Sequence, residues 1–225
     1  MQNQKLVMLL LVVGCVFLLG CKPDKLNIEV YTSDVSIVGT SDEVMEVPVT
    51  ATFSVMGEDE ENLLDKVREI ALNYVSEGTE IEKTKAQFGD ALIIKTKIPI
   101  GQPQAIKEFL SDKPRLLQLN VQQNEDEEFD VTVELTSYAE KFSDEISQLN
   151  FMLGLKMPAA STVIRVVGDD RDPPTVNAIA IFESNKPYLN YSKTVERRES
   201  VELDFKGGDA SVYSQIPVTF TLNYN

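Results

Sequence analysis

The chain contains no histidine and no tryptophan, and cysteine occurs at only two of its 225 positions. Without histidine, Ser-His-Asp and Cys-His nucleophilic catalysis are excluded, together with imidazole-ligated zinc, copper and iron sites. Sugar-binding sites rely on aromatic platforms, of which tryptophan is missing here. The chemistry that remains is that of carboxylates, Ser-Lys dyads and oxygen-ligated calcium or magnesium.

Basic residues are also scarce, because 21 Lys and Arg stand against 36 Asp and Glu, for a formal net charge of −15. Nucleic-acid binding depends on the release of counterions by Lys and Arg, so we expect no nucleic-acid partner. A uniformly acidic body is also repelled by anionic lipid head groups. Any association with a membrane therefore needs an attachment other than a basic surface.

A membrane attachment is indicated by residues 6–21, which read LVMLLLVVGCVFLLGC and follow a short segment with one cation, Lys5. The apolar run is shorter than the roughly 20 residues of a membrane-spanning helix. It has the length of an export-signal core. Its end, Leu18-Leu19-Gly20-Cys21, resembles the lipobox of bacterial lipoproteins. The alternative is an uncleaved anchor that contains an incidental cysteine.

The resemblance implies that a signal peptidase removes residues 1–20 and that Cys21 carries a diacylglycerol and a fatty acid. Anchoring by several chains is stable, whereas a single chain gives only marginal binding. Lys22, a residue other than Asp after the cysteine, is similar to the outer-membrane signal of Gram-negative lipoproteins. We expect a lipid-anchored protein on the periplasmic side of a membrane, the outer one, with no other cofactor.

Cleavage would leave 205 residues, with a charge near −16 because only Lys5 is lost among the charged side chains. Cys15 belongs to the leader, so the mature chain has no disulfide and depends on a packed core, which 43% hydrophobic residues can supply. We divide it into a tether (residues 21–25), a first half (26–115) and a second half (116–225). The two halves are alternatively one continuous domain.

Hydrophobic periodicity predicts an α+β fold of mostly antiparallel sheets with two main amphipathic helices on one face. One helix contains Leu63, Val67 and Ile70, and Gly78 is its predicted left-handed stop. The other follows a capping-box pattern at Ser137 and Glu140. Residues 46–99 and 129–183 both read strand, helix, strand, strand. This order indicates either a duplicated βαββ unit or a coincidence of common elements, followed by a β-rich C-terminal segment.

Asp169, Asp170 and Asp172 are the best candidates for metal ligands, because three carboxylates fall within four residues of a loop. The loop lacks the spacing and the distal Glu of an EF-hand, so we assign no metal site. The runs 58–61 and 125–128 are also acidic. A helix first turn explains the former, and a solvated loop or strand end explains the latter.

No residue stands out as catalytic. Ser192 and Lys193 are adjacent, so on a strand their side chains would point to opposite faces. Four tyrosines of the last segment could line a protein-binding surface or be half-buried in strands: Tyr188, Tyr191, Tyr213 and Tyr224.

The leading interpretation is a non-enzymatic lipoprotein that binds another envelope protein or supports an envelope assembly. Two alternatives stay open at this point. One is a module that holds a lipid or a small apolar ligand in a large cavity. The other is a hydrolase that uses carboxylates or a Ser-Lys pair, in a cleft with strongly perturbed pKa values. An open, uncharged edge strand would favour binding by strand addition.

Overall fold

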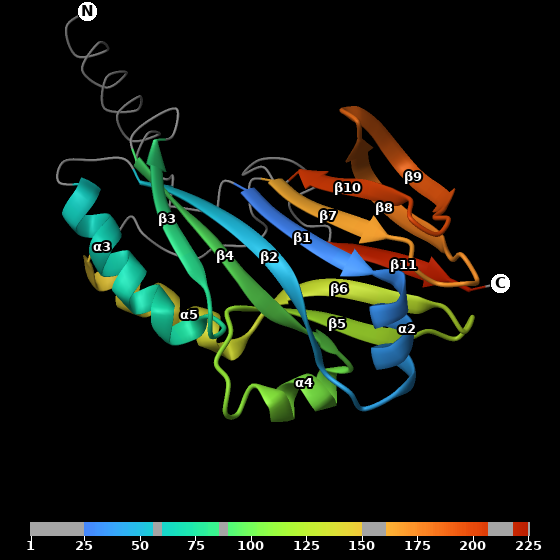
Figure 1. Ribbon diagram of the computed structural model, residues 1–225, viewed down its shortest axis with the longest axis horizontal. Helices are drawn as coiled ribbons and strands as arrows, with labels where there is room; N and C mark the ends of the chain where they lie inside the picture. The colour runs from blue at the N-terminus through green and yellow to red at the C-terminus, as the bar shows by residue number, and fades with distance from the viewer. Residues whose placement is uncertain (1–24, 56–59, 86–89, 150–160, 207–217, 225) are drawn as a thin grey trace, which may run out of the picture.

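The computed structural model describes residues 25–55, 60–85, 90–149, 161–206 and 218–224, and its elements are labelled as in Figure 1. The strands are β1 (Lys25–Tyr31), β2 (Met45–Val55), β3 (Glu80–Lys85), β4 (Asp90–Gly101), β5 (Leu117–Gln123), β6 (Phe129–Leu135), β7 (Ser161–Val167), β8 (Thr175–Glu183), β9 (Lys186–Thr194), β10 (Ser200–Lys206) and β11 (Thr219–Asn223). The helices are α2 (Thr32–Thr40), α3 (Glu60–Ala71), α4 (Pro103–Phe109), α5 (Ser137–Leu149) and the single 3₁₀ turn η1 (Leu72–Tyr74).

Nine strands form a sheet that closes on itself in the order β10, β7, β1, β2, β4, β5, β6, β11, β8 (Figure 1). The ring closes between β8 and β10, and this seam is narrow because the described parts of the two strands share a single residue pair, Phe182 with Asp204. Among the described strands, two pairings are parallel, β1 with β7 and β4 with β5. Two further strands are attached to the wall of this barrel: β3 pairs with β4, and β9 pairs with β8.

The expected α+β fold with helices on one face of open sheets is therefore wrong, and the fold is a β-barrel with attached helices. Closure depends on pairs far apart in the chain, such as Leu26 with Thr162, which local periodicity does not reveal. A duplicated βαββ unit is not supported either. In the first segment β2, β4 and β3 are neighbours, whereas β6, β7 and β8 of the second do not pair with one another.

The barrel interior is packed with aliphatic side chains that alternate with outward polar ones along each strand. In β1, for example, Leu26, Ile28 and Val30 are fully buried. Helix α2 closes one end of the barrel with Val35 and Val38. A Cβ atom at Gly39 would lie 2.5 Å from the ring of Phe129, so the close approach of this helix to β6 requires glycine.

A second, smaller core lies outside the barrel, where α3 and α5 pack side by side against β4 and β3 (Figure 1). The rings of Tyr74 and Phe142 meet edge to face, with centroids 5.7 Å apart. Both amphipathic helices were expected from their periodicity. The predicted stop at Gly78 is wrong, because α3 ends at Ala71 and η1 at Tyr74, and Gly78, with a φ of 78°, lies in the turn before β3. The cap of α5 is Thr136, whose hydroxyl accepts the Tyr138 amide proton, and not the predicted Ser137.

One buried polar group in the barrel has no hydrogen-bond partner among the described residues. The Thr162 hydroxyl lies in β7, is fully buried, and neighbours Leu26 and Phe205. An unsatisfied buried hydroxyl costs about 1–3 kcal/mol. We therefore expect Thr162→Val, of the same shape, to raise the free energy of unfolding by about 1 kcal/mol or more in urea titrations. Thr162→Ser, which keeps the hydroxyl and removes a methyl group, should lower it.

Candidate functional site

The three aspartates predicted as weak metal candidates lie beyond the end of β7, next to the start of α2. Asp169 accepts hydrogen bonds from the Ser33 amide (3.0 Å), the Ser33 hydroxyl (2.6 Å) and the Thr32 hydroxyl (3.0 Å). It thus caps the N-terminus of α2 from 136 residues away. Asp172 is exposed. Among the described residues no group of three His, Cys, Asp or Glu side chains is arranged to hold a metal ion.

The pKa shifts in this cluster are those expected if the Asp169 carboxylate caps the N-terminus of α2. Burial alone would raise the pKa of Asp169, but the hydrogen bonds from Ser33 and Thr32 outweigh it and lower the pKa below its ordinary value. Burial and the nearby Asp169 and Asp170 raise the pKa of Asp34. Burial and Asp170 also raise the pKa of Tyr224, whose hydroxyl donates to the Thr32 carbonyl at 2.6 Å. The cluster holds α2 on the barrel.

Loss of this cap should be visible as a pH-dependent loss of stability. Asp169→Ala is expected to lower the free energy of unfolding at neutral pH by about 1 kcal/mol. Because the pKa of Asp169 is lower in the folded state, its contribution is present above the unfolded-state pKa and disappears as pH falls through the folded-state pKa. The difference between the variant and the wild type should therefore vanish in acid, measured by denaturant titration. Asp172→Ala is the control, and a deficit that persists in acid would contradict the assignment.

The other candidates from the sequence do not come together as a catalytic site. Residues 58 and 59 of the first acidic run lie outside the described residues, and α3 begins at Glu60. The second run forms the β5–β6 turn, where the Asn124 side chain accepts the amide protons of Asp126 and Glu128. Ser192 and Lys193 lie in β9 and pair with different residues of β8. Cys21 and Tyr213 are also outside the described residues.

The described residues enclose no large apolar cavity. A small space of about 40 Å³ lies between the barrel and the helical layer, lined by residues such as Val49, Tyr74 and Ile94. This volume holds about one water molecule and is far below the several hundred Å³ of a ligand pocket. Arg115 lies beside it, and its buried guanidinium contacts Glu46 at 2.9 Å.

The edges of the sheet are the distinctive feature of the surface. Among the described strands, β3 and β9 each have a single neighbour. Four of the six residues of β3 are charged, and Lys95 of the adjacent β4 contacts both Glu80 and Glu82. In β9, by contrast, the stretch 188–192 is uncharged, and Leu189 is 76% exposed, more than any other large hydrophobic residue described. Charge protects the β3 edge against strand pairing, and the middle of β9 lacks this protection.

The main chain of β9 has a defined pattern of free groups. The two-residue turn Ser184–Asn185 has positive φ at both positions (49° and 64°), as in a type I′ hairpin, and Glu183 pairs with Lys186. Antiparallel pairs alternate between hydrogen-bonded and non-bonded, so every second residue of β9 directs its N–H and C=O away from β8. Counting from the turn, these residues are Pro187, Leu189, Tyr191 and Lys193. Proline, which has no N–H, occupies the first of these positions, where no ladder bond is lost.

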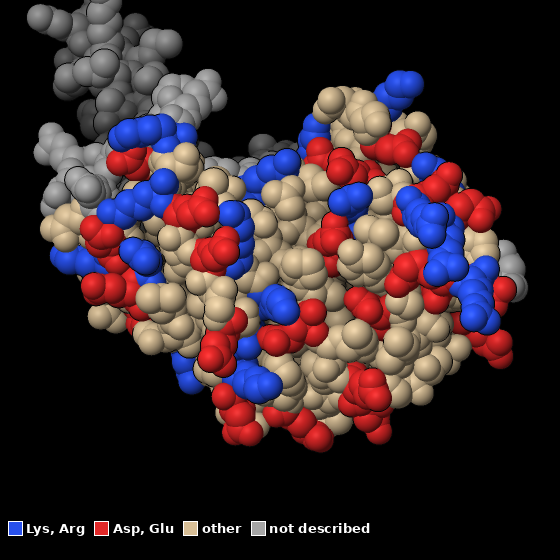
Figure 2. Space-filling view, in the orientation of Figure 1, with Lys and Arg blue, Asp and Glu red and all other residues tan. Residues whose placement is uncertain are grey.

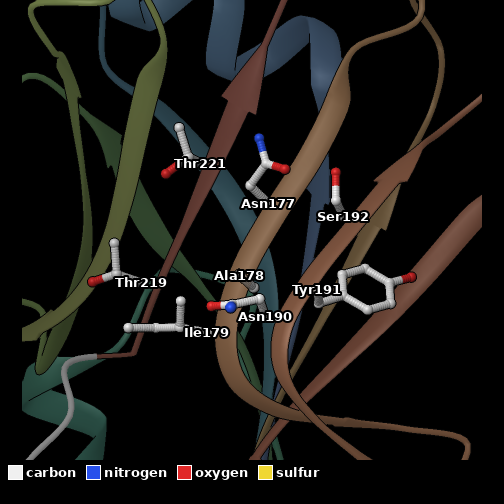
Figure 3. A pocket seen from close by; sticks show the side chains of 8 residues that line it. All are labelled: Asn177, Ala178, Ile179, Asn190, Tyr191, Ser192, Thr219 and Thr221. Carbon is white, nitrogen blue, oxygen red and sulfur yellow. The ribbon is translucent and has the colours of Figure 1, made fainter.

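A depression of about 540 Å³ lies beside this edge (Figure 3). Its lining contains no charged residue and comes from three strands: Asn177, Ala178 and Ile179 of β8, Asn190, Tyr191 and Ser192 of β9, and Thr219 and Thr221 of β11. The side chains of Asn177, Asn190 and Ser192 have no hydrogen-bond partner among the described residues. Figure 3 shows the Tyr191 ring turned away from the two threonines.

The buried Tyr191 fixes the position of β9. Its hydroxyl donates to Glu183 at 3.0 Å, and its ring meets that of Tyr188 edge to face. Burial and the Glu183 carboxylate raise its pKa well above the ordinary value, so it stays protonated. Two of the four tyrosines singled out in the sequence thus belong to the hairpin. The depression was not foreseen, because besides the β8–β9 hairpin it needs β11, which pairs with β8 although it is distant in the chain, as in the pair of Ala178 with Phe220.

Comparison with family models, with curated proteins and with solved structures finds no match to this chain. Among the described residues, no helix is long and apolar enough to cross a membrane. The leader sequence and the geometry of the β8–β9 edge are therefore the features of this chain that indicate a function.

Proposed function

We propose that this chain is a lipid-anchored, non-enzymatic binding protein of the bacterial envelope that recognises an extended segment of another protein. The anchor is supported by the Leu18-Leu19-Gly20-Cys21 sequence after a short apolar core. Recognition is supported by the uncharged edge of β9, which is the single observation that carries the proposal. The proposed location is the periplasmic face of the outer membrane.

The binding mode is strand addition. An extended partner segment pairs with the free N–H and C=O groups of Leu189, Tyr191 and Lys193, which supply affinity without regard to sequence. The uncharged depression beside β9 then takes a side chain of the partner, with Asn190 and Ser192 at its edge as free hydrogen-bonding groups. Each main-chain hydrogen bond contributes about 1 kcal/mol, and the seated side chain adds hydrophobic contact with Ile179.

Pairing of β9 with a second copy of the chain is disfavoured. The mature body carries a charge near −16, so two copies repel each other. Lys186 and Lys193 stand at the two ends of β9 and have no ion-pair partner among the described residues. Antiparallel pairing of two β9 strands would bring these lysines close together, and a lysine on an edge strand blocks such pairing.

The anchor is tested by Cys21→Ser. We expect this variant to lose its lipid and to run on gels as an unprocessed precursor, because in proteins with this motif the peptidase cleaves before the cysteine only after a lipid is attached to its sulfur. Mass spectrometry of the wild type should find an acylated N-terminal peptide that begins at Cys21. An unmodified fragment with the leader attached would refute the anchor.

The edge is tested with a phage-displayed library of random linear peptides selected on the purified protein. Bound peptides should slow amide hydrogen exchange at Leu189, Tyr191 and Lys193. Leu189→Pro removes one outward N–H and keeps the bonds to β8, so we expect about fivefold weaker binding, equivalent to one hydrogen bond. Leu189→Lys introduces a charge at the edge and should weaken binding further.

Leu72→Lys is the matched control, since Leu72 is another exposed leucine (51%) and lies on η1, away from β9. It should bind the selected peptides as the wild type does. Thermal unfolding establishes that the Leu189 variants are folded. Strand addition would be refuted by peptides that bind equally well to Leu189→Pro, or that leave the three amides unprotected.

A further inference from the structure

One end of the barrel is defined by the residue at which the described chain begins. Lys25 is the first residue of β1, and the next residue, Leu26, lies opposite Thr162 of β7. Thr162 in turn pairs with Phe205 of β10, and Ser161 pairs with Lys206. The start of β1, the start of β7 and the end of β10 therefore lie at the same rim.

The β8–β9 turn belongs to this rim as well. The Lys206 ammonium lies 4.3 Å from the centre of the Phe182 ring, and Phe182 precedes the Ser184–Asn185 turn by two residues, so the turn and the following Lys186 lie near the end of β10. Figure 1 shows the start of β1, the arrowhead of β10 and the β8–β9 turn along the upper side, and α2 on the lower side. We call the set Lys25, Glu183, Lys186, Asp204 and Lys206 the anchor rim.

Covalent distance keeps the anchor rim close to the proposed lipid. Cys21 precedes Lys25 by four residues, and an extended chain advances at most about 3.6 Å per residue. Lys25, the rim residue on this tether, therefore stays within about 14 Å of the acylated cysteine. No other described part of the molecule is tied so closely to the bilayer.

Charge is distributed unequally between the two ends of the barrel. The anchor rim has three lysines and two carboxylates, and Lys206 contacts Asp204 at 3.7 Å. The opposite end holds Asp34, Asp169 and Asp170 around α2, together with the acidic turn 125–128. Figure 2 shows acidic side chains along the lower edge of the molecule and elsewhere on the same face, with Lys and Arg side chains between them. The seven residues of β1 separate the ends by about 23 Å, more than twice the Debye length of about 8 Å.

We infer that the anchored body stands with the anchor rim against anionic phospholipid head groups and with the α2 end directed away from the bilayer. This inference rests on the proposed lipid anchor. The acidic end is repelled by the lipid surface, while each lysine near that surface is attracted by about 1 kcal/mol. The acidic groups of the α2 end are too far from the bilayer to oppose binding, and within the rim three lysines outnumber two carboxylates. In this orientation β9 begins at the membrane at Lys186 and rises from it, so its free edge is open to a partner.

The orientation can be measured because the mature chain has no thiol other than the lipidated Cys21. Ser184→Cys places a fluorescent label at the β8–β9 turn, and Glu125→Cys places one at the opposite end. The lipidated variants are reconstituted into phosphatidylcholine vesicles with phosphatidylglycerol and a head-group nitroxide quencher. The label at position 184 should be strongly quenched and the label at 125 should not.

Charge reversal at the three rim lysines, Lys25, Lys186 and Lys206→Glu, should abolish this difference between the two labels. The matched control reverses three exposed lysines elsewhere, Lys97, Lys107 and Lys113, and should preserve it. Equal quenching of both positions in the unreversed protein would overturn the orientation while leaving the anchor intact. A protein that fails to co-sediment with vesicles would overturn the anchor, and the orientation with it.

Discussion

Closure of the sheet is the constraint on which the rest of this structure depends. When nine strands pair around a ring, their main-chain groups are satisfied by neighbours, and the inward side chains form a core without a disulfide. The ring ends at a seam where Phe182 pairs with Asp204. Ala180 of β8, at a φ of 53°, lies two residues before this pair. Past the seam the hairpin continues as β9, whose outer edge has no partner among the described strands.

The two unclosed edges have opposite chemistry. β3 is short and charged, and it is covered on one side by the helical layer with Leu64 and Phe142. β9 is longer, neutral in its middle, and bordered by an uncharged depression. In a chain with 36 acidic residues, a neutral surface of this kind is uncommon and needs an explanation. Strand addition supplies one, since it uses main-chain groups that charge would hinder.

Sequence reasoning located most individual elements, because alternation and helical periodicity are local properties. The amphipathic helices around Val67 and Phe142 were expected, and so was the β-rich character of the C-terminal segment. Helix α2 was missed, since TSDVSIVGT is rich in β-branched residues and its cap, Asp169, is distant in sequence. The barrel was missed because pairs such as Leu26 with Thr162 leave no local signal. The depression escaped notice for the same reason, whereas the tyrosines of β9 were visible in the sequence but could not be assigned a role.

Pro187 has a consequence for how a guest strand would be positioned. Since it lacks a proton to donate, a guest strand that slides one step toward the hairpin tip would gain a single hydrogen bond there, to the Pro187 carbonyl, instead of two. The favoured alignment is therefore centred on Tyr191. The proline would thus fix where along β9 a bound strand lies, so that bound strands of any sequence pass beside the depression lined by β8, β9 and β11.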